Sequence, residues 1–308
     1  VGVLALSYIL PLFRFTFYEN TVAFLYLSRL IFYLLYFAYF AHFIKYQITF
    51  RKTLMYGIII FSTLTIAISF IQYFLYTDLR NLLYLGWDPH LSRMFGAFFD
   101  TSVAAAIYGL MFLFFIGSYR IFVPFFLVST VLTFSRSSYI MLIILLIWNF
   151  ISQKKIMLLF TFFAIFLFLI WLAPKGFGEG TNLRRTFSIQ SRLNDYKEAI
   201  EVWKRSPLLG IGYNRIRFIK LNGSFGHAAS SFSSSYLIIL ASGGIIGLLL
   251  FAACIVRLMM FNKMVSLLIG FIGFLSLTDN IILHPFVMFL LGALVITLLI
   301  RPSERLLQ

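Results

Sequence analysis

Two arginines at the ends of apolar stretches are the side chains whose placement most strongly suggests chemistry. Arg93 begins the segment RMFGAFFDTSVAA, and Arg136 stands in TFSRSSYIML between two apolar runs. A charge at membrane depth costs roughly 3 kcal/mol or more, so such a residue usually faces a cavity or a partner. A guanidinium group binds phosphate oxygens through two parallel hydrogen bonds. We therefore expect Arg93 and Arg136 to bind a phosphate or a diphosphate.

A structural role is the alternative for these arginines. They could extend toward the lipid headgroups, or pair with acidic residues at the same membrane face (Asp78, Asp88 and Asp100). No carboxylate lies close to Arg136 in the sequence, and this favours a functional role for Arg136. Arg29 lies within an apolar run, and we expect its side chain to extend to the headgroup region.

A basic segment at residues 174–231 supplies further cations. It holds ten Lys and Arg residues against four Asp and Glu residues, a net charge of +6. Residues 188–207 are predicted to form a helix that Ser188 or Ser191 caps and Pro207 ends. Arg192 would lie in the first turn, where the helix dipole disfavours a cation. An anionic partner fits this charge, and so do anionic lipid headgroups.

One face of this predicted helix is apolar. It carries Leu193, Tyr196, Ile200 and Trp203 at helical spacing. This pattern indicates an amphipathic helix that lies on the membrane surface or on the helical bundle.

The residues that follow, 206-SPLLGIGYNRIRFIK-220, combine glycines with cations. Gly210 and Gly212 permit a sharp turn or the close approach of two backbones. Arg215 and Arg217 are further candidate ligands for a diphosphate, on the basis of charge. Six serines between Ser230 and Ser242 could cap the next helix or line a polar cavity that admits a sugar. The three glycines after them (Gly243, Gly244 and Gly247) favour close helix packing.

The elements that position these residues are apolar. The chain is 61% hydrophobic, with a mean hydropathy of +0.96, and this excludes an ordinary soluble domain. Apolar runs of about 20 residues, long enough to cross a bilayer core, recur along it. We predict an all-α, polytopic transmembrane bundle, one integral membrane domain over residues 1–308, with a long extracytoplasmic loop at 174–231. About ten spans are expected: 1–13, 21–44, 54–77, 95–116, 119–135, 137–151, 156–173, 232–256, 263–278 and 282–300.

Several classes of chemistry are not expected. The single cysteine, Cys254, cannot form an intramolecular disulfide. The four histidines (His42, His90, His227 and His284) lack the spacing of a metal motif, so we predict neither a metal nor another cofactor. The first residues contain no basic region or cleavage site, so no signal peptide is predicted, and earlier helices could be missing.

The charge of the short connections predicts the orientation. One set holds ten basic residues and the opposite set holds four, namely Arg14, Arg80, Arg93 and Arg136. The side with more Lys and Arg is cytoplasmic, so both termini are expected there and the 174–231 loop outside. Much of the overall charge of +15 then reflects topology, and we expect no nucleic-acid partner. The ten cytoplasmic residues are Lys45, Arg51, Lys52, Arg120, Lys154, Lys155, Arg257, Lys263, Arg301 and Arg305.

The order of these motifs resembles the bacterial O-antigen ligase and O-antigen polymerase family. The motifs are Arg93 with Gly96, the pair Ser135 and Arg136, the helix from Arg192 into SPLLGIG, and the polar approach to YLIILASGGIIG. The resemblance covers roughly residues 80–300. It implies a membrane glycosyltransferase, independent of metal, that takes a glycan from undecaprenyl diphosphate at the outer face of the cytoplasmic membrane. By motif, Arg136 and Arg192 would hold the diphosphate.

The resemblance also suggests partners and a base. The partners are the lipid bilayer, the undecaprenyl-diphosphate-linked oligosaccharide, an acceptor glycan and, as a further candidate, a chain-length regulator. His227 is the candidate base, and Asp279 is a candidate for orienting a base or an acceptor. The ligases carry a His and an Asn where this chain has Ser233 and Ser234. This departure favours a polymerase of glycan repeat units over a ligase that attaches the glycan to a lipid or protein. A lipid-linked glycan transporter or flippase is the alternative from another class.

Overall fold

The computed structural model describes residues 2–46, 48–85, 87–117, 119–176, 179–220 and 231–299, and their regular secondary structure is entirely helical. The predicted all-α class is therefore confirmed for the described residues. The α-helices are α1 (Gly2–Ile9), α2 (Phe17–Tyr46), α3 (Ile48–Leu75), α4 (Thr101–Phe115), α5 (Val123–Leu132), α6 (Arg136–Ser152), α7 (Ile156–Leu172), α8 (Phe187–Lys204), α9 (Ile216–Ile219), α10 (Ser235–Met259), α11 (Lys263–Thr278) and α12 (Pro285–Leu299).

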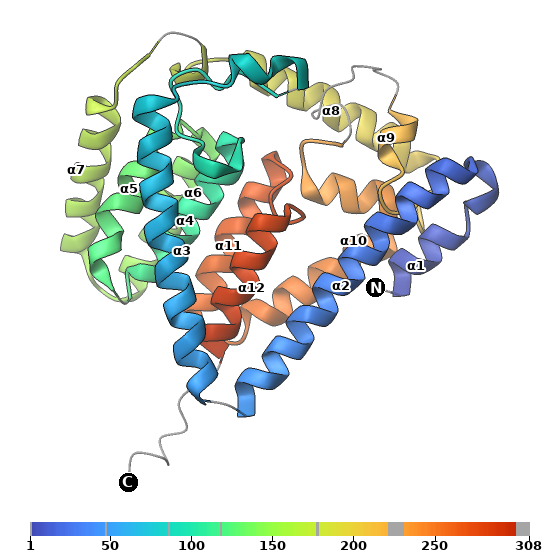
Figure 1. Ribbon diagram of the computed structural model, residues 1–308, viewed down its shortest axis with the longest axis horizontal. Coiled ribbons are helices and arrows are strands. Elements are labelled where there is room, and N and C mark those ends of the chain that lie inside the picture. The colour runs from blue at the N-terminus through green and yellow to red at the C-terminus, as the bar shows by residue number, and fades with distance from the viewer. Residues whose placement is uncertain are drawn as a thin grey trace.

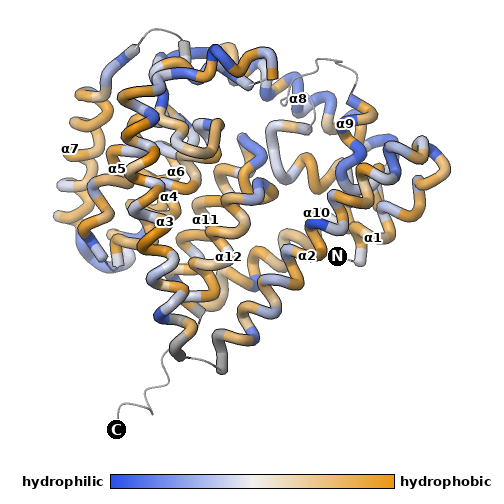
Figure 2. Tube along the Cα trace, viewed as in Figure 1, coloured by the Kyte–Doolittle hydropathy of each residue, from blue (hydrophilic) through white to orange (hydrophobic). Residues whose placement is uncertain are grey.

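The helices form two groups that α11 and α12 connect (Figure 1). Helices α3 to α7 lie together on one side, and α1, α2, α9 and α10 lie on the other. Helix α8 lies across one end of the molecule and contacts α10. Figure 2 shows that the long helices are mostly hydrophobic, whereas hydrophilic residues concentrate in α8 and in the connections beside it. The polar residues that could do chemistry are therefore collected at this end.

Helix α4 forms the centre of the packed core. Asp100 caps its start by accepting hydrogen bonds from the backbone N–H groups of Ser102, at 2.6 Å, and Val103, at 3.0 Å. Nearly all residues of α4 are buried against α5, α6, α11 and α12. The small residues Ala104–Ala106 allow this close packing. Because α4 is immobilised on all sides, its first turn is a rigid support for the polar end of the molecule.

Each of the ten segments predicted to cross the membrane contains a helix. Three helices are long and apolar enough to cross a bilayer alone: Phe17–Phe43, Lys52–Leu75 and Ser235–Met259. Six shorter apolar helices of 10–17 residues accompany them in the described part of the chain. Helix α1 has 8 residues, which at about 1.5 Å per residue span roughly 12 Å. The topology of about ten spans therefore stays a prediction.

Helix α10 contains a break at Gly244, which has φ 64° and ψ −169°. The break leaves backbone groups on both sides of it without helical partners, and residues 207–212 supply the missing partners. Ile211 N–H donates to Ala241 O at 2.9 Å, and Ile245 N–H donates to Pro207 O at 2.9 Å. A Cβ atom on Gly244 would lie 2.1 Å from Leu208 O. Gly244 therefore permits backbone contact with the 207–212 segment, whereas Gly243 and Gly247 face Leu4 and Val3 of α1, which agrees with the predicted helix packing.

Candidate functional site

Four guanidinium groups gather near the start of α8, and we call them the arginine cluster: Arg93, Arg136, Arg185 and Arg192. They come from four separate segments of the chain. Burial, and then the charges of Arg136 and Arg192, lower the pKa of Arg185. Burial, and then the charge of Arg185, lower the pKa of Arg93 to about 10. Arg192 alone among the four forms an ion pair within the described residues, so the cluster holds an excess of positive charge that suits an anion.

Arg136 begins α6 and holds the connection that leads into α8. Its Nη1 donates to the backbone oxygens of Leu183, at 3.2 Å, and Arg185, at 2.7 Å. Its Nη2 donates to Ser188 Oγ at 2.8 Å. These contacts use three of the five N–H donors of a guanidinium group. Arg136 therefore has a clear structural function and two donors left for a ligand.

This contact also corrects a prediction about α8. Ser188 or Ser191 was expected to cap the helix, but Thr186 occupies the capping position, and no side chain makes a capping hydrogen bond there. The prediction for Ser188 is wrong because its hydroxyl group serves Arg136 instead. The helix ends at Lys204, three residues before Pro207.

Arg93 is positioned by a glutamine in α3. Gln72 Oε1 accepts hydrogen bonds from the backbone N–H groups of Phe95 and Gly96, both at 2.9 Å. Gln72 Nε2 donates to the backbone oxygen of Arg93 at 3.3 Å. Gly96 has φ +57°, and a Cβ atom there would lie 2.6 Å from Tyr108 Oη. The Arg93–Gly96 motif thus has a physical basis, because only glycine fits at this turn.

Arg185 joins two connections and was not among the predicted site residues. It donates to the backbone oxygens of Gly180 and, at 3.3 Å, Phe134. Gly180 also lies against Arg93, whose Cδ is 2.8 Å from the position of a Cβ on that glycine. In the sequence, Arg185 was distinguished only by its position in the basic segment at residues 174–231. Its closeness to Arg136 arises because residues 179–186 fold back over the start of α6.

Arg192 connects the arginine cluster to the acidic side of the site. Its Nη2 donates to Asp279 Oδ2 at 2.7 Å, which brings α8 to the C-terminal end of α11. Burial raises the pKa of Asp279 to about 6, although the charge of Arg192 opposes this shift. The structure therefore brings together Arg93, Arg136, Arg192 and Asp279, four of the predicted site residues.

A polar cavity of about 260 Å³ adjoins this ion pair, and we call it the acidic cavity. Four carboxylates line it: Asp88, Asp100, Asp195 and Asp279. Two histidines, His90 and His284, also line it. Burial lowers the pKa of His90, although the charge of Asp100 opposes this shift. Ser231 and Ser233 contribute to the wall as well, which fits the prediction that the serine run lines a polar cavity.

One wall of the acidic cavity is an ion pair supported by a serine. Lys220 Nζ donates to Asp195 Oδ1 at 2.6 Å. The backbone N–H and the hydroxyl group of Ser233 donate to Asp195 Oδ2, at 2.7 Å and 2.5 Å. Ser233 is the position at which the ligases carry histidine by the resemblance given above. In this chain, that position supports a carboxylate at the cavity wall.

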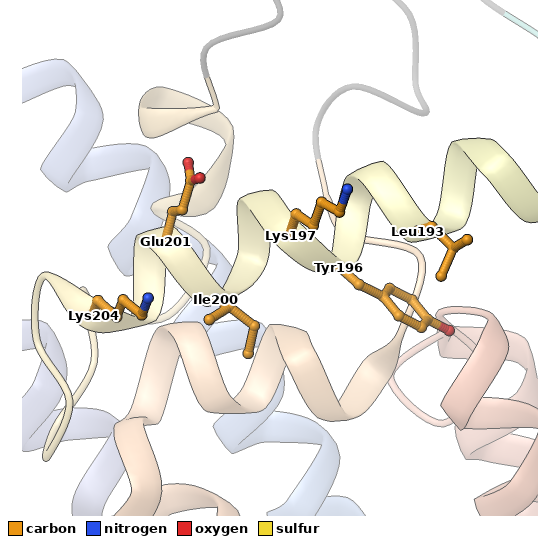
Figure 3. Close-up of a pocket in the computed structure, with 6 residues that line it drawn as sticks. All are labelled: Leu193, Tyr196, Lys197, Ile200, Glu201 and Lys204. Atoms are coloured by element: carbon orange, nitrogen blue, oxygen red, sulfur yellow. The ribbon is translucent and has the colours of Figure 1, made fainter.

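The outer side of α8 forms a shallow hollow in which every lining residue comes from the same helix (Figure 3). Tyr196 Oη donates to Leu277 O at 2.6 Å. The buried residues of α8 are Ala199 and Val202, whereas Leu193 is 48% exposed. The predicted apolar stripe of α8 is thus only partly correct. The side of the helix that contacts α10 is centred on Ala199 and Val202, which are smaller than the residues of the predicted stripe. The hollow is lined by Leu193, Tyr196, Lys197, Ile200, Glu201 and Lys204.

Arg215 and Arg217 have other surroundings. Arg215 is fully buried, and its guanidinium carbon lies 4.8 Å from the ring centre of Tyr8 and 4.6 Å from that of Phe15. It also donates to Asn20 Oδ1 at 2.6 Å. Arg217 lies 5.7 Å from the ring centre of Phe218. The described contacts connect Arg215 to α1 and α2 and place neither arginine beside Arg136.

The candidate base, His227, lies within residues 221–230, outside the described residues. Sequence reasoning did not select Gln72, Arg185, Asp100 or the two described histidines of the cavity. Asp100 had a weak local signal, since an Asp before Thr and Ser commonly caps a helix. Gln72 stood out only as a polar residue inside an apolar run. Within the described residues, no group of three or more His, Cys, Asp and Glu side chains has an arrangement that could hold a metal.

Comparison with known proteins supports the motif resemblance. Residues 121–252 match the family model described as O-Antigen ligase. The match includes Arg136, Arg185 and Arg192, and it leaves Arg93 and Asp279 outside. No match was found among curated proteins or among solved structures. Over residues 121–252, this integral membrane protein is therefore similar to the O-antigen ligase family.

Proposed function

We propose that this protein is a polysaccharide polymerase that transfers glycan repeat units from undecaprenyl diphosphate to a growing glycan. The observation that carries the proposal is the arginine cluster, in which four guanidinium groups share one carboxylate partner among the described residues. A diphosphate would supply the missing negative charge, and guanidinium groups bind its oxygens bidentately. The product would be an O-antigen, a capsule or an exopolysaccharide.

The reaction proposed is a displacement at the anomeric carbon of the donor glycan. An acceptor hydroxyl oxygen forms a bond to this carbon, and the bond between the carbon and the diphosphate oxygen breaks. The electron pair leaves with undecaprenyl diphosphate, on which negative charge develops. Preorganised cations stabilise such a charge, and the loss of one donor of this kind typically costs on the order of 100-fold in rate.

The proton of the acceptor hydroxyl group must pass to a base or a relay. His227 is our candidate base, and Asp279 is our candidate positioning residue. The contact of 2.7 Å between Asp279 and Arg192 supports the role of Asp279. Asp279 also lines the acidic cavity and therefore lies between this cavity and the arginine cluster. Arg215 and Arg217 were proposed as further diphosphate ligands. The burial of Arg215 against Tyr8 and Phe15 favours a structural function for it instead.

The choice of polymerase over ligase rests on the Ser233 position. A ligase of this family would carry histidine there, and here the serine supports Asp195. The alternative is a ligase that transfers the finished glycan to a lipid or protein acceptor. We also propose that both termini are cytoplasmic, that the site faces outward and that a chain-length regulator acts with the protein. The excess of Lys and Arg in one set of short connections supports this orientation.

The experiment is to measure surface polysaccharide length in a deletion strain complemented with the wild-type gene or with Arg136→Ala. We expect single repeat units in the deletion strain, and long polymer with the wild type but not with Arg136→Ala. Arg80→Ala is the matched control, because Arg80 is exposed and paired with Asp78. Long polymer that accumulates on the lipid carrier without attachment would identify a ligase. Unchanged polysaccharide in every strain would overturn the enzyme proposal in favour of a transporter.

Because Arg136 also holds residues 183–188, its loss could reduce the amount of folded protein. Arg136→Lys therefore accompanies it, with the membrane level of each variant measured by immunoblotting. A lysine retains the charge but lacks the planar fork. Normal membrane levels with shortened polymer in both variants would support diphosphate binding. Full-length polymer from Arg136→Ala at normal protein level would exclude Arg136 from the site.

A further inference from the structure

The acidic cavity has an excess of negative charge beside a cluster of positive charge. Its lining contains four carboxylates and neither Lys nor Arg. Asp195 is paired with Lys220, and Asp279 is paired with Arg192. No ion pair is formed by Asp88 or Asp100 within the described residues. The cavity therefore differs in charge from the diphosphate site proposed next to it.

Asp100 is the carboxylate of this cavity that caps a helix. Its Oδ1 accepts two backbone hydrogen bonds at the start of α4, so its position is fixed by the most deeply packed helix. The charge of Asp100 also influences His90, Asp279 and His284, which places it near three other groups of the lining. Asp88 is exposed and lies at the margin. A fixed carboxylate of this kind accepts hydrogen bonds from hydroxyl or ammonium groups.

Two aromatic rings and an unpaired nitrogen add features that suit a sugar. The rings of Trp87 and Phe99 are 5.5 Å apart at 49°, and both line the cavity. An aromatic ring packs against the apolar C–H face of a sugar while hydroxyl groups reach polar partners. His284 Nδ1 is buried and has no hydrogen-bond partner among the described residues. A buried polar atom without a partner is unfavourable, and a ligand hydroxyl group could satisfy it.

The volume and position of the cavity define how much of a glycan it could hold. Its volume of about 260 Å³ is just below the range of roughly 300–1,000 Å³ for pockets that enclose drug-sized ligands. One sugar ring fits such a space better than an oligosaccharide. Asp279 belongs both to the lining and to the ion pair with Arg192. A sugar in the cavity would therefore present a hydroxyl group toward the diphosphate end of the donor.

We propose that the acidic cavity binds the terminal sugar of the acceptor glycan, and that it selects a neutral or amino sugar and rejects an acidic one. This inference rests on the proposed function, in which the arginine cluster holds the donor. Asp100 and Asp88 accept hydrogen bonds from the sugar, and Trp87 and Phe99 pack against its ring. A uronic acid carboxylate would lie beside Asp100, in a cavity whose lining contains neither Lys nor Arg. Repulsion between two such charges weakens binding by on the order of 100-fold at partly buried sites.

Binding of simple glycosides to the full-length protein in lipid nanodiscs tests the proposal. The probes are methyl glucoside, methyl glucosaminide and methyl glucuronide, which differ only at C2 or C6. Saturation-transfer NMR should detect the first two and not the third. Asp100→Asn retains a residue that can cap α4 but removes the charge, and together with Asp88→Asn it should allow the glucuronide to bind. Trp87→Ala should abolish binding of all three.

Asp78→Asn is the matched control, because it removes a carboxylate of the same external connection that is paired with Arg80 outside the cavity lining. It should retain the preference of the wild type. Equal binding of glucuronide and glucoside to the wild type, or no glycoside binding at all, would overturn the proposal. So would unchanged binding after Trp87→Ala with the protein folded.

Failure of this inference and failure of the proposed function are distinguishable. Loss of polymer with Arg136→Ala, combined with glucuronide binding to the wild type, would retain the polymerase and reject the selectivity of the cavity. Unchanged polysaccharide in the deletion strain, combined with selective glycoside binding, would reject the polymerase and retain the sugar site.

Discussion

The start of α8 and the segment that follows its end both hold arginines, but their partners differ. At the start, Arg93, Arg136 and Arg185 contact mainly backbone oxygens, and one carboxylate, Asp279, pairs with the cluster. After the end, Arg215 is enclosed by Tyr8, Phe15 and Asn20. The net charge of the whole loop therefore counts two kinds of cation together. Arg185 and Arg192 lie at the proposed ligand site, whereas Arg215 is enclosed by side chains of the protein.

The first way to test this comparison is Arg192→Ala, for which we expect the largest effect. The rate of glycan transfer should fall by on the order of 100-fold or more, because a donor directed at the leaving group is lost. Transfer would be measured with purified protein and lipid-linked repeat units. Arg192→Lys should lose less, since it retains the charge. Equal losses for Arg80→Ala, an exposed arginine, would mean that general surface charge explains the effect.

Gln72→Met tests whether the cluster depends on its support. This variant removes the acceptor for Phe95 N–H and Gly96 N–H, and each unsatisfied buried group costs about 1–3 kcal/mol. A displacement of Arg93 by about 1 Å should lower the transfer rate by on the order of 10-fold to 100-fold. Thr63→Val is the control on the same helix, since the hydroxyl group of Thr63 donates to Ile59 O within α3. A normal rate with lowered thermal stability would show that Arg93 acts without precise placement.

Asp279→Asn sharpens the comparison through pH. Burial raises the pKa of Asp279 to about 6 in the folded protein, above its unfolded value of about 3.9, so the folded state binds this proton more tightly. The resulting stabilisation is complete below about pH 4 and is lost as the pH rises through about 6. Its size is roughly 3 kcal/mol at most.

We therefore expect the melting temperature of the wild type to fall relative to that of Asp279→Asn between pH 4 and pH 7. Thermal unfolding of both proteins in nanodiscs, followed by intrinsic fluorescence, measures the difference. Parallel curves over this range would mean that Arg192 keeps Asp279 ionised throughout, and that the two groups act as a fixed ion pair.

Arg215→Met should have the smallest effect on transfer. We expect a rate within about 2-fold of the wild type, since surface and structural substitutions away from a site leave the chemistry intact. Stability should change little or rise, because Arg215 Nε and Nη1 are buried without hydrogen-bond partners among the described residues, and an apolar side chain of similar length removes that cost. A fall of the size expected for Arg192→Ala would place Arg215 in the donor site after all and remove the contrast between the two regions.

The sequence alone determined the class of this protein and the identity of its main cations. Apolar runs predicted the helices, because only a helix satisfies its backbone groups in lipid. The motifs around Arg93, Arg136 and Arg192 predicted a resemblance to the O-antigen ligase and O-antigen polymerase family, and isolated arginines at the ends of apolar runs suggested an anion site. The helical class and the similarity to this family could be predicted because hydropathy and local motifs are properties of short stretches of chain, whereas the anion site stays a prediction.

Only the tertiary structure decided which charges meet. Arg136 and Arg185 are 49 positions apart and Arg192 and Asp279 are 87 positions apart, and no local pattern predicts such contacts. The acidic cavity likewise gathers residues from the connection before α4, from α8, from the segment before α10 and from the connection after α11. Arg215 carries the same charge as Arg192, but the aromatic rings of Tyr8 and Phe15 bury it. Charge is a property of the residue, whereas its availability depends on which distant segments pack around it.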